Sequence, residues 1–209
     1  ASLSLANSTS FQVDVREKKI ESLQESGSSG VHLTVSKNKR RSTVSSNDLR
    51  LETLVPLIRS TMDALPFMGK DEYYSLPDPE LQGRAPGNLK LLDPDFDKLN
   101  SEQKVQIPLD LEQLTLNSDK RLRTEQSFYS DSISYMVHAD SNGFFEGETK
   151  TLHSLGVSMV ADDAKSTSAG TDASTNIGRK QTDGWYSTAR LYKNLTPAKE
   201  IVEKACLRT

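Results

Sequence analysis

Two blocks of the sequence place apolar residues at every second position, and a stretch dense in proline lies between them. The alternation covers residues 11–15 and 31–35 in the first block and 133–137 in the second. A period of two is typical of strands with one buried and one exposed face. The sequence therefore predicts strand blocks over 1–45 and 121–190. We expect an α+β fold, with antiparallel, meandering sheets and helices on one face.

A helix is predicted over 48–65, between the first strand block and the proline-rich stretch. Its apolar residues recur at helical spacing: Leu51, Leu54, Val55, Ile58, Met62 and Leu65. Asn47 or Asp48 offers a side-chain oxygen for the N-cap. Pro56 lies beyond the first turn and predicts a kink or a late start, and Pro66 ends the helix.

Two further helices are predicted from their N-terminal signals. Asn100 and Gln103 form a capping-box pattern, although the residues that follow alternate like a strand and Pro108 interrupts them. At the end of the chain, Thr196 is the expected N-cap and Pro197 the first residue of a helix over 197–208.

Four turns connect the predicted strands. The first three are expected at Glu17–Lys19, Gly27–Gly30 and Lys37–Arg41. The strongest signal is Asp140–Gly143, because the pair Asn142-Gly143 suits the two positive φ angles of a type I′ turn.

The stretch 66–98 holds five of the eight prolines and three glycines, which excludes long regular elements. Aromatic and leucine residues are interspersed there, so we predict a strap laid over the surface of the fold. Residues 162–176 are small and polar, and we expect them to be mobile. We interpret 1–209 as a single N-terminal domain of a longer protein whose C-terminal domain is absent from this chain.

The composition excludes several classes of function. Lys and Arg total 26 and Asp and Glu total 29, giving a net charge of −3, which disfavours a protein that coats nucleic acid or binds membranes through basic residues. No stretch approaches the roughly 18 apolar residues of a transmembrane helix, and no signal peptide is recognised. We therefore expect a cytoplasmic protein. Cys206 is the single cysteine and is interpreted as a packed small residue.

The search for catalytic groups returns none. His32, His138 and His153 each lie in a predicted strand, none precedes a glutamate, and no two share a helical spacing. The helical zinc-peptidase motif is therefore missing, and the three are interpreted as ordinary sheet histidines. No phosphate-binding glycine loop and no nucleophile elbow occurs either. We predict no catalytic, cofactor-binding or metal-binding residue in this chain.

Three weaker patterns are also given structural interpretations. Asp93, Asp95 and Asp97 imitate the start of a calcium loop, but Lys98 and Lys104 stand where glycine and glutamate are needed. The basic cluster of Lys37, Lys39, Arg40 and Arg41 is interpreted as a solvated turn, with a patch for an acidic partner as the alternative. The triplets 7–9 and 194–196 match the glycosylation pattern, which arises often by chance.

A series of motifs runs in a fixed order along the chain. A strand pair within Phe11–Glu25 is followed by Gly30–Val35, Ser45–Leu49, Lys70–Leu81, Asp119–Leu122 with Glu125 and Ser127, and Ser141–Phe144. This order resembles the N-terminal half of the TldD/PmbA family, and within it the PmbA (TldE) branch. The resemblance runs over nearly the whole chain. Departures are Pro56 and Pro108 inside predicted helices and the short Ser/Thr-rich stretch at 162–176.

The resemblance implies a subunit of a cytoplasmic TldD–TldE-type metalloprotease, also known as a modulator of DNA gyrase. In that family two related subunits act as a complex on unfolded or short peptides, and the TldD-type subunit holds the zinc. Its ligands, a His-Glu-x-x-x-His helix and a distant cysteine, map onto no position of this sequence, and Cys206 does not correspond to that cysteine. The family normally has a helix before the first strand and a β-rich domain after residue 209.

Three functions follow in order of preference. The first is a non-catalytic N-terminal part of a PmbA/TldE-like subunit, with a TldD-type subunit and unfolded peptides as partners and no cofactor of its own. The second is a regulatory protein that binds DNA gyrase without a peptidase role. The third is an enzyme of unrecognised mechanism, ranked last because the sequence shows no nucleophile–base pair.

Overall fold

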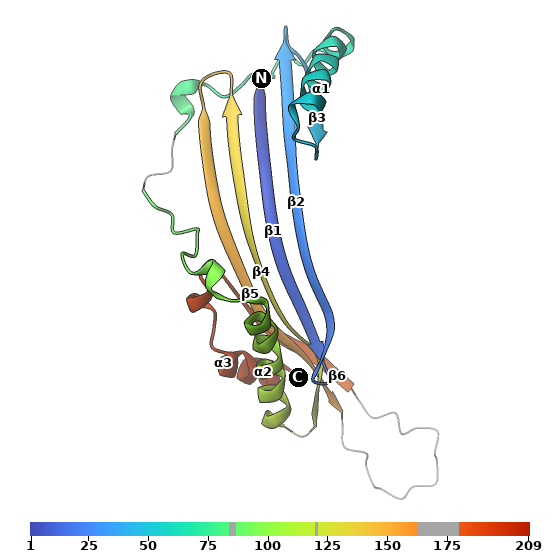
Figure 1. Cartoon of the computed structure of the whole chain (residues 1–209), viewed down its shortest axis with the longest axis vertical. Helices are drawn as coiled ribbons and strands as arrows, with labels where there is room; N and C mark the ends of the chain where they lie inside the picture. Colours follow the sequence, from blue (N-terminus) through green and yellow to red (C-terminus); the bar gives the residue numbers. More distant parts are fainter. Residues whose placement is uncertain (84–86, 120, 163–179) are drawn as a thin grey trace, which may run out of the picture. The chain divides into compact units, whose positions relative to one another are not determined.

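The computed structural model describes residues 1–83, 87–119, 121–162 and 180–209 (Figure 1). Six strands form one sheet in the order β3-β2-β1-β4-β5-β6. Their bounds are β1 Ser2–Arg16, β2 Lys19–Lys37, β3 Arg40–Ser46, β4 Leu122–Asp140, β5 Phe145–Asp162 and β6 Lys180–Ala189. The predicted α+β class with an antiparallel sheet is confirmed.

Three α-helices accompany the sheet in the described ranges: α1 Leu51–Ala64, α2 Ser101–Ser118 and α3 Ala198–Arg208. Short 3₁₀ turns occur at Leu65–Phe67, Pro79–Leu81, Phe96–Lys98 and Tyr192–Asn194. Among the described residues, none of the helices has the length and apolar character needed to span a membrane.

The chain divides into two compact units that alternate along the sequence. Unit 1 comprises Ala1–Thr9, Ser26–Leu91 and Ile133–Lys150, and unit 2 comprises Ser10–Glu25, Leu92–Ser132 and Thr151–Thr209. Four strands, β1, β2, β4 and β5, each contribute residues to both units. The interpretation of 1–209 as a single domain stays a prediction.

Two of the three turns predicted in the first strand block form as expected. Glu17 and Lys18 separate β1 from β2, Asn38 and Lys39 separate β2 from β3, and all four have positive φ between 52° and 61°. The turn predicted at Gly27–Gly30 is wrong. These residues lie inside β2, because glycine and serine are tolerated in a strand wherever the ladder continues through them.

The hairpin between β4 and β5 is confirmed, but its predicted type I′ geometry is wrong. Among the turn residues 140–144, only Gly143 has a positive φ, of 96°. The Gly143 amide donates to the Asp140 carbonyl at 3.2 Å, and the Asp140 amide donates to the Phe144 carbonyl at 2.9 Å. The Asp140 carboxylate also accepts from the amides of Asn142 and Phe144. The Asp140 side chain thereby stabilises a turn that is longer than the predicted type I′ turn. This turn needs one residue in the left-handed conformation, whereas a type I′ turn needs two.

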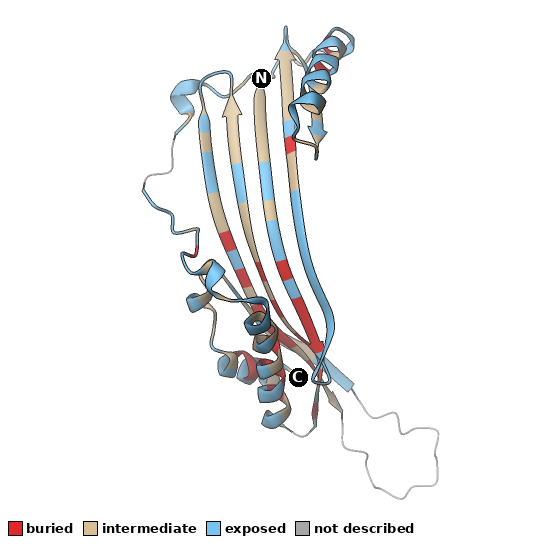
Figure 2. Ribbon diagram, in the orientation of Figure 1, coloured by how far each residue is buried: buried red, intermediate tan, exposed pale blue. Residues whose placement is uncertain are grey.

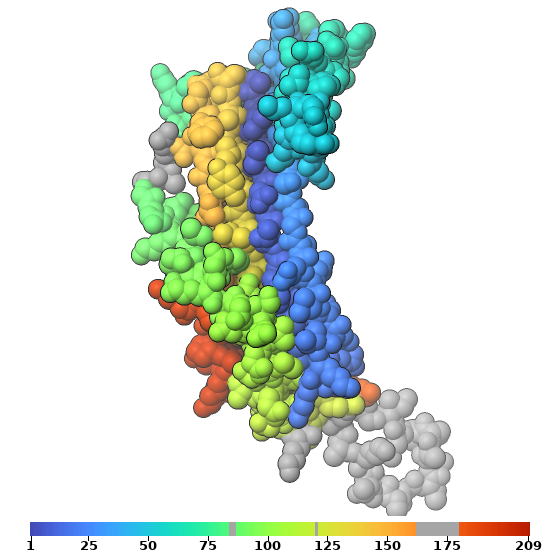
Figure 3. All heavy atoms as spheres, viewed as in Figure 1, coloured from blue at the N-terminus to red at the C-terminus, as the bar shows by residue number. Residues whose placement is uncertain are grey.

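Helix α1 begins three residues later than the predicted start at 48. Its N-cap is Arg50, which makes no side-chain capping bond. The Asp48 carboxylate accepts instead from the Arg50 guanidinium and the Thr53 hydroxyl, so it stabilises the turn that precedes the helix. Pro56 lies inside the helix, which ends before Pro66 as expected. In Figure 3 the side chains of α1 form part of the outer surface, where Leu51 is 77% exposed.

Helix α2 confirms the capping box. The Gln103 amide donates to the Asn100 side chain at 2.8 Å, and the Asn100 amide donates to the Gln103 side chain at 3.0 Å. Pro108 does not interrupt the helix but removes one intrahelical donor. The Pro108 carbonyl accepts the buried Ser127 hydroxyl at 2.8 Å, which links α2 to β4.

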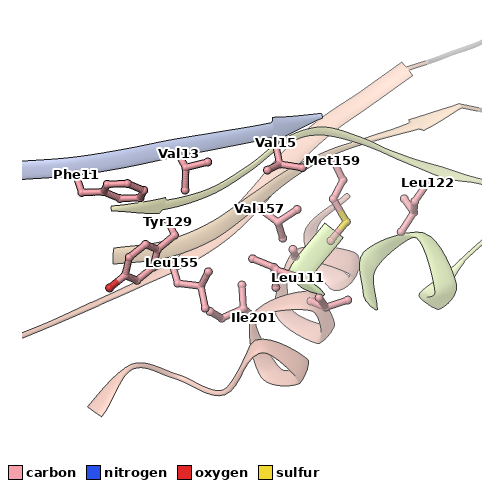
Figure 4. Packing of buried hydrophobic residues seen from close by; sticks show 12 residues of the cluster. Phe11, Val13, Val15, Leu111, Leu122, Tyr129, Leu155, Val157, Met159 and Ile201 are labelled. Carbon is pink, nitrogen blue, oxygen red and sulfur yellow. The ribbon is translucent and has the colours of Figure 1, made fainter. Parts of the chain in front are cut away.

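Unit 2 contains the hydrophobic core, where α2 and α3 pack against the sheet (Figure 2). Leu111 of α2 and Ile201 of α3 are fully buried and point toward Leu155 and Val157 of β5 (Figure 4). The remaining core members are Phe11, Val13, Val15, Leu122, Tyr129, Met159, Val202 and Ala205. Helix α3 begins at Ala198 with Pro197 as N-cap, so the cap predicted at Thr196 is wrong. The Thr196 amide donates to Ser187 of β6.

The proline-rich stretch lies against the strands, as predicted for a strap. In unit 1 the Gln82 side chain donates through Nε2 to the Asp140 carboxylate at 2.6 Å, and the Asn142 side chain donates to the Pro77 carbonyl at 2.9 Å. In unit 2 the Asp93 amide donates to the Thr151 hydroxyl of β5 at 2.8 Å. The stretch 162–176, expected to be mobile, lies outside the described residues except for Asp162.

Candidate functional site

The three histidines lie in strands, as predicted, but their surroundings differ. His32 Nδ1 lies 2.9 Å from the Ser45 hydroxyl across the β2–β3 ladder, and His138 Nδ1 lies 2.8 Å from the Ser4 hydroxyl. These two are ordinary polar residues of unit 1. His153, in unit 2, is 1% exposed and belongs to a network of buried polar side chains.

The buried network joins His153 to a tyrosine and two aspartates. Its Nδ1 lies 3.1 Å from the Tyr129 hydroxyl, which donates to Asp131 Oδ2 at 3.0 Å. Its Nε2 lies 3.2 Å from Asp93 Oδ2, without the alignment of a hydrogen bond. Lys104 of α2 completes the network, with Nζ 2.7 Å from Asp131 Oδ2.

Burial and hydrogen bonds set the protonation of the network. Burial lowers the pKa of His153, and the nearby carboxylates of Asp131 and Asp93 oppose this without reversing it. Burial alone would raise the pKa of Asp93, but the amides of Tyr192 and Asp95 donate to it and hold its pKa below the ordinary value. Burial also raises the pKa of Tyr129, with the charge of Asp131 adding to the effect. These shifts favour an uncharged His153 imidazole beside the Asp93 carboxylate.

Aromatic rings surround this network. Phe96 and Tyr192 lie with their ring centroids 5.5 and 5.8 Å from that of His153. The Lys104 ammonium lies 5.1 Å from the Phe11 ring and 5.3 Å from the Phe96 ring. A histidine–carboxylate pair can act in acid–base catalysis only where a substrate reaches it. Here the groups bond one another and fix the C-terminal end of the strap to β4, β5 and the β6–α3 connection.

The network was missed by sequence reasoning because its members are far apart in the chain. Asp93, the first residue of the rejected calcium pattern, accepts the backbone amides of Asp95 and Tyr192. The available signal was the alternation in β5, where Thr151, His153 and Leu155 share the buried face. Within the described ranges, no group of three or more His, Cys, Asp or Glu side chains is placed to hold a metal ion.

The basic turn Lys37–Arg41 is mostly exposed, as predicted for a solvated turn, and it also contacts the strap. The Arg40 guanidinium donates to the Met68 carbonyl, and the Lys39 carbonyl accepts the Asp71 amide at 2.7 Å. The Arg41 guanidinium lies 4.9 Å from the Tyr74 ring centroid. These cations fix the strap to the β2–β3 hairpin within unit 1.

Cys206 and the two glycosylation-like triplets add no chemistry. Cys206 Sγ is partly buried on α3 and lies 3.2 Å from the Ser118 hydroxyl, in agreement with a packed small residue. Asn7 is exposed on β1, and Asn194 is exposed in the 3₁₀ turn before α3.

A charged cavity of about 470 Å³ forms a second feature of unit 2. It lies among the β1–β2 turn, α2 and strands β4, β5 and β6. Glu112 of α2 lines it and is 1% exposed, and Glu112 Oε2 accepts the Lys18 amide at 2.7 Å. The carboxylate thereby stabilises a turn whose two residues, Glu17 and Lys18, both have positive φ.

Comparison with known proteins identifies relatives over nearly the whole chain. Residues 94–209 match the PmbA/TldA metallopeptidase central domain, and residues 1–65 match the PmbA/TldA metallopeptidase domain 1. The metalloprotease PmbA of Escherichia coli O157:H7 is 24% identical over 213 residues, covering 98% of this chain and 46% of the relative.

Solved structures of similar fold also exceed this chain in length. A protein of Bacteroides thetaiotaomicron, described as a candidate modulator of DNA gyrase, is 25% identical with a TM-score of 0.82, covering 99% of this chain and 44% of the other. TldE of Thermococcus kodakarensis shares the fold at 15% identity with a TM-score of 0.77, covering 99% and 43%. The chain thus spans less than half the length of these relatives. The family match over more than half of its residues shows that the chain belongs to the PmbA/TldA (TldD/PmbA) metallopeptidase family.

Proposed function

We propose that this chain is the N-terminal, non-catalytic part of a PmbA/TldE-like subunit of a cytoplasmic zinc metalloprotease that degrades unfolded or short peptides. The observation that carries the proposal is the family match to two metallopeptidase domains over 1–65 and 94–209. The PmbA/TldE branch is supported by the similarity to PmbA and by the shared fold with TldE. Zinc is then held by a TldD-type partner subunit.

The bonding of the histidines supports the proposal that residues 1–209 hold no zinc. His32, His138 and His153 each lie within hydrogen-bond distance of a hydroxyl group in the same unit. A zinc site needs three protein ligands converging on one point. Zinc analysis of the tag-free chain tests this, and one tightly held zinc ion per chain would contradict the proposal.

A sheet edge in unit 2 gives this part of the subunit a means of holding extended peptides. Within β2, the residues paired with β3 are Val31–Lys37, so Lys19–Glu25 have β1 on one side and no described strand on the other. Ile20 and Leu23 of this segment are 49% and 50% exposed. Strand addition gives affinity through main-chain hydrogen bonds and makes little demand on side-chain identity.

The alternative function is regulation of DNA gyrase without a peptidase role. It is favoured by the description given to the Bacteroides relative. Gel filtration of the full-length protein, mixed separately with a TldD-type subunit and with purified gyrase, separates the two. Association with the TldD-type subunit supports the proposed function, whereas association with gyrase alone would favour the alternative.

A further inference from the structure

The charged cavity of unit 2 holds two buried polar atoms that lack partners. Glu112 Oε1 and Thr124 Oγ1 have no hydrogen-bond partner among the described residues, and the two residues are 1% and 6% exposed. Both residues line the cavity. A buried carboxylate oxygen without a donor destabilises a protein by about 1–3 kcal/mol or more, so Glu112 Oε1 favours an N–H or O–H donor from a ligand, and the Thr124 hydroxyl can accept from the same donor.

The rim of this cavity has the opposite charge. Lys18 and Lys180 line it, and neither ammonium group has a partner among the described residues. Arg16 also lines the cavity and makes only a loose pair with Glu21, at 3.8 Å. Arg123 adds a fourth cationic side chain, and the rim carries two carboxylates, Glu17 and Glu125, of which Glu125 accepts the Ser158 hydroxyl at 2.9 Å. The cavity thus combines a buried anionic group with a mainly cationic rim.

We propose that this cavity binds a small zwitterion, a free amino acid or a short peptide, through its α-ammonium and α-carboxylate groups. The ammonium group donates to Glu112 Oε1 and Thr124 Oγ1, and the carboxylate pairs with Lys18 and Lys180 at the rim. Leu116 and Val160 supply apolar wall for a side chain. Short peptides are chosen as ligands on the basis of the proposed function, because a peptidase releases them. The binding of an ammonium group by Glu112 does not depend on the proposed function.

The size and the access of the cavity agree with a ligand of this class. Its volume of about 470 Å³ falls within the range of roughly 300–1,000 Å³ that is common for small-molecule sites. Glu112 Oε1 has almost no solvent-exposed surface. Thr124 Oγ1 is equally buried. Binding therefore requires a small rotation of the Glu112 side chain toward the cavity, about the bond from the Lys18 amide to Oε2.

Titration calorimetry on the full-length protein tests the proposal with four ligands: alanine, alanyl-alanine, N-acetyl-alanyl-alanine and alanyl-alanine amide. We expect binding of alanine, of alanyl-alanine or of both, and this comparison separates the two sources of the zwitterion. N-acetylation removes the ammonium group and should weaken binding on the order of tenfold or more, the value of a charged hydrogen bond. Amidation should weaken it less, because the rim is more exposed to solvent.

Substitutions locate the binding. Glu112→Gln should weaken binding on the order of tenfold, whereas Glu102→Gln, the same change at an exposed position of α2, should leave it unchanged. Thr124→Val gives a second test if Glu112→Gln does not fold. Absence of binding at millimolar ligand would overturn the proposal, as would equal binding of the acetylated peptide or of the Glu112→Gln protein. Because cleavage is not measured, failure of the peptidase proposal would leave the alanine result standing.

Discussion

His153 Nε2 and Asp93 Oδ2 lie 3.2 Å apart, and their side chains are only 1% and 5% exposed. The pair joins β5 to the C-terminal end of the proline-rich strap, which belongs to unit 2. Asp93 also accepts the amides of Asp95 and Tyr192, so one carboxylate connects three segments that are distant in sequence. The stability of unit 2 should therefore depend on the protonation state of this pair.

The first prediction concerns pH. Burial holds the pKa of His153 below its ordinary value of 6.5, so the unfolded chain takes up this proton first as the pH falls. We expect the free energy of unfolding to decrease as the pH drops through about 6.5 toward the lowered pKa. Denaturant unfolding across this range should show a smaller slope for His153→Gln, whereas exposed His32→Gln should keep the wild-type slope. Equal slopes in all three proteins would contradict the assignment.

The second prediction concerns the β4–β5 turn. Gly143 has a φ of 96°, and a Cβ atom there would have open space around it. Gly143→Val should reduce the free energy of unfolding by about 1–3 kcal/mol through backbone strain alone. Gly69→Val is the matched control, since Gly69 also has open space but no positive φ. The same loss in both variants would show that the left-handed conformation is not the cause.

The third prediction concerns the contact between β5 and β6. A Cβ atom on Gly156 would lie 2.6 Å from Tyr186 Cβ and 2.7 Å from the Phe128 ring. Gly156→Ala should therefore destabilise the protein by about 1–3 kcal/mol, the range for overpacking. At Gly27 the nearest atoms are 3.9 Å away, so Gly27→Ala should fall within roughly 0.5 kcal/mol of wild type in thermal unfolding. Wild-type stability of Gly156→Ala would refute this packing.

Local sequence patterns predicted helices and strands correctly where the interacting residues are close together in the sequence. The Asn100–Gln103 capping box needs only three residues of separation, and the alternating patterns mark one face of each strand. The predictions of the α1 cap and of the β4–β5 turn type were wrong because an aspartate side chain there has several possible local hydrogen-bond partners. Asp48 bonds Arg50 and Thr53 and does not cap α1, and Asp140 stabilises a turn with one left-handed residue.

The candidate sites could not be read from the sequence, because contacts over long separations create them. Glu112 and Lys18 are 94 positions apart, and Asp93 and Tyr192 are 99 apart. His153 resembled any strand histidine until its neighbours were known. Family resemblance supplied what the residue patterns did not, because the collinear order of motifs identifies a family even where no motif carries chemistry.

The most direct test of the proposed function is cleavage of an unstructured peptide by the full-length protein alone, by a TldD-type subunit alone and by their mixture. The account predicts no cleavage by the full-length protein alone and chelator-sensitive cleavage by the mixture that exceeds that of the TldD-type subunit alone. Robust, chelator-sensitive cleavage by the full-length protein alone would contradict its assignment as the non-catalytic PmbA/TldE-like subunit. A mixture no more active than the TldD-type subunit would contradict a role in the peptidase.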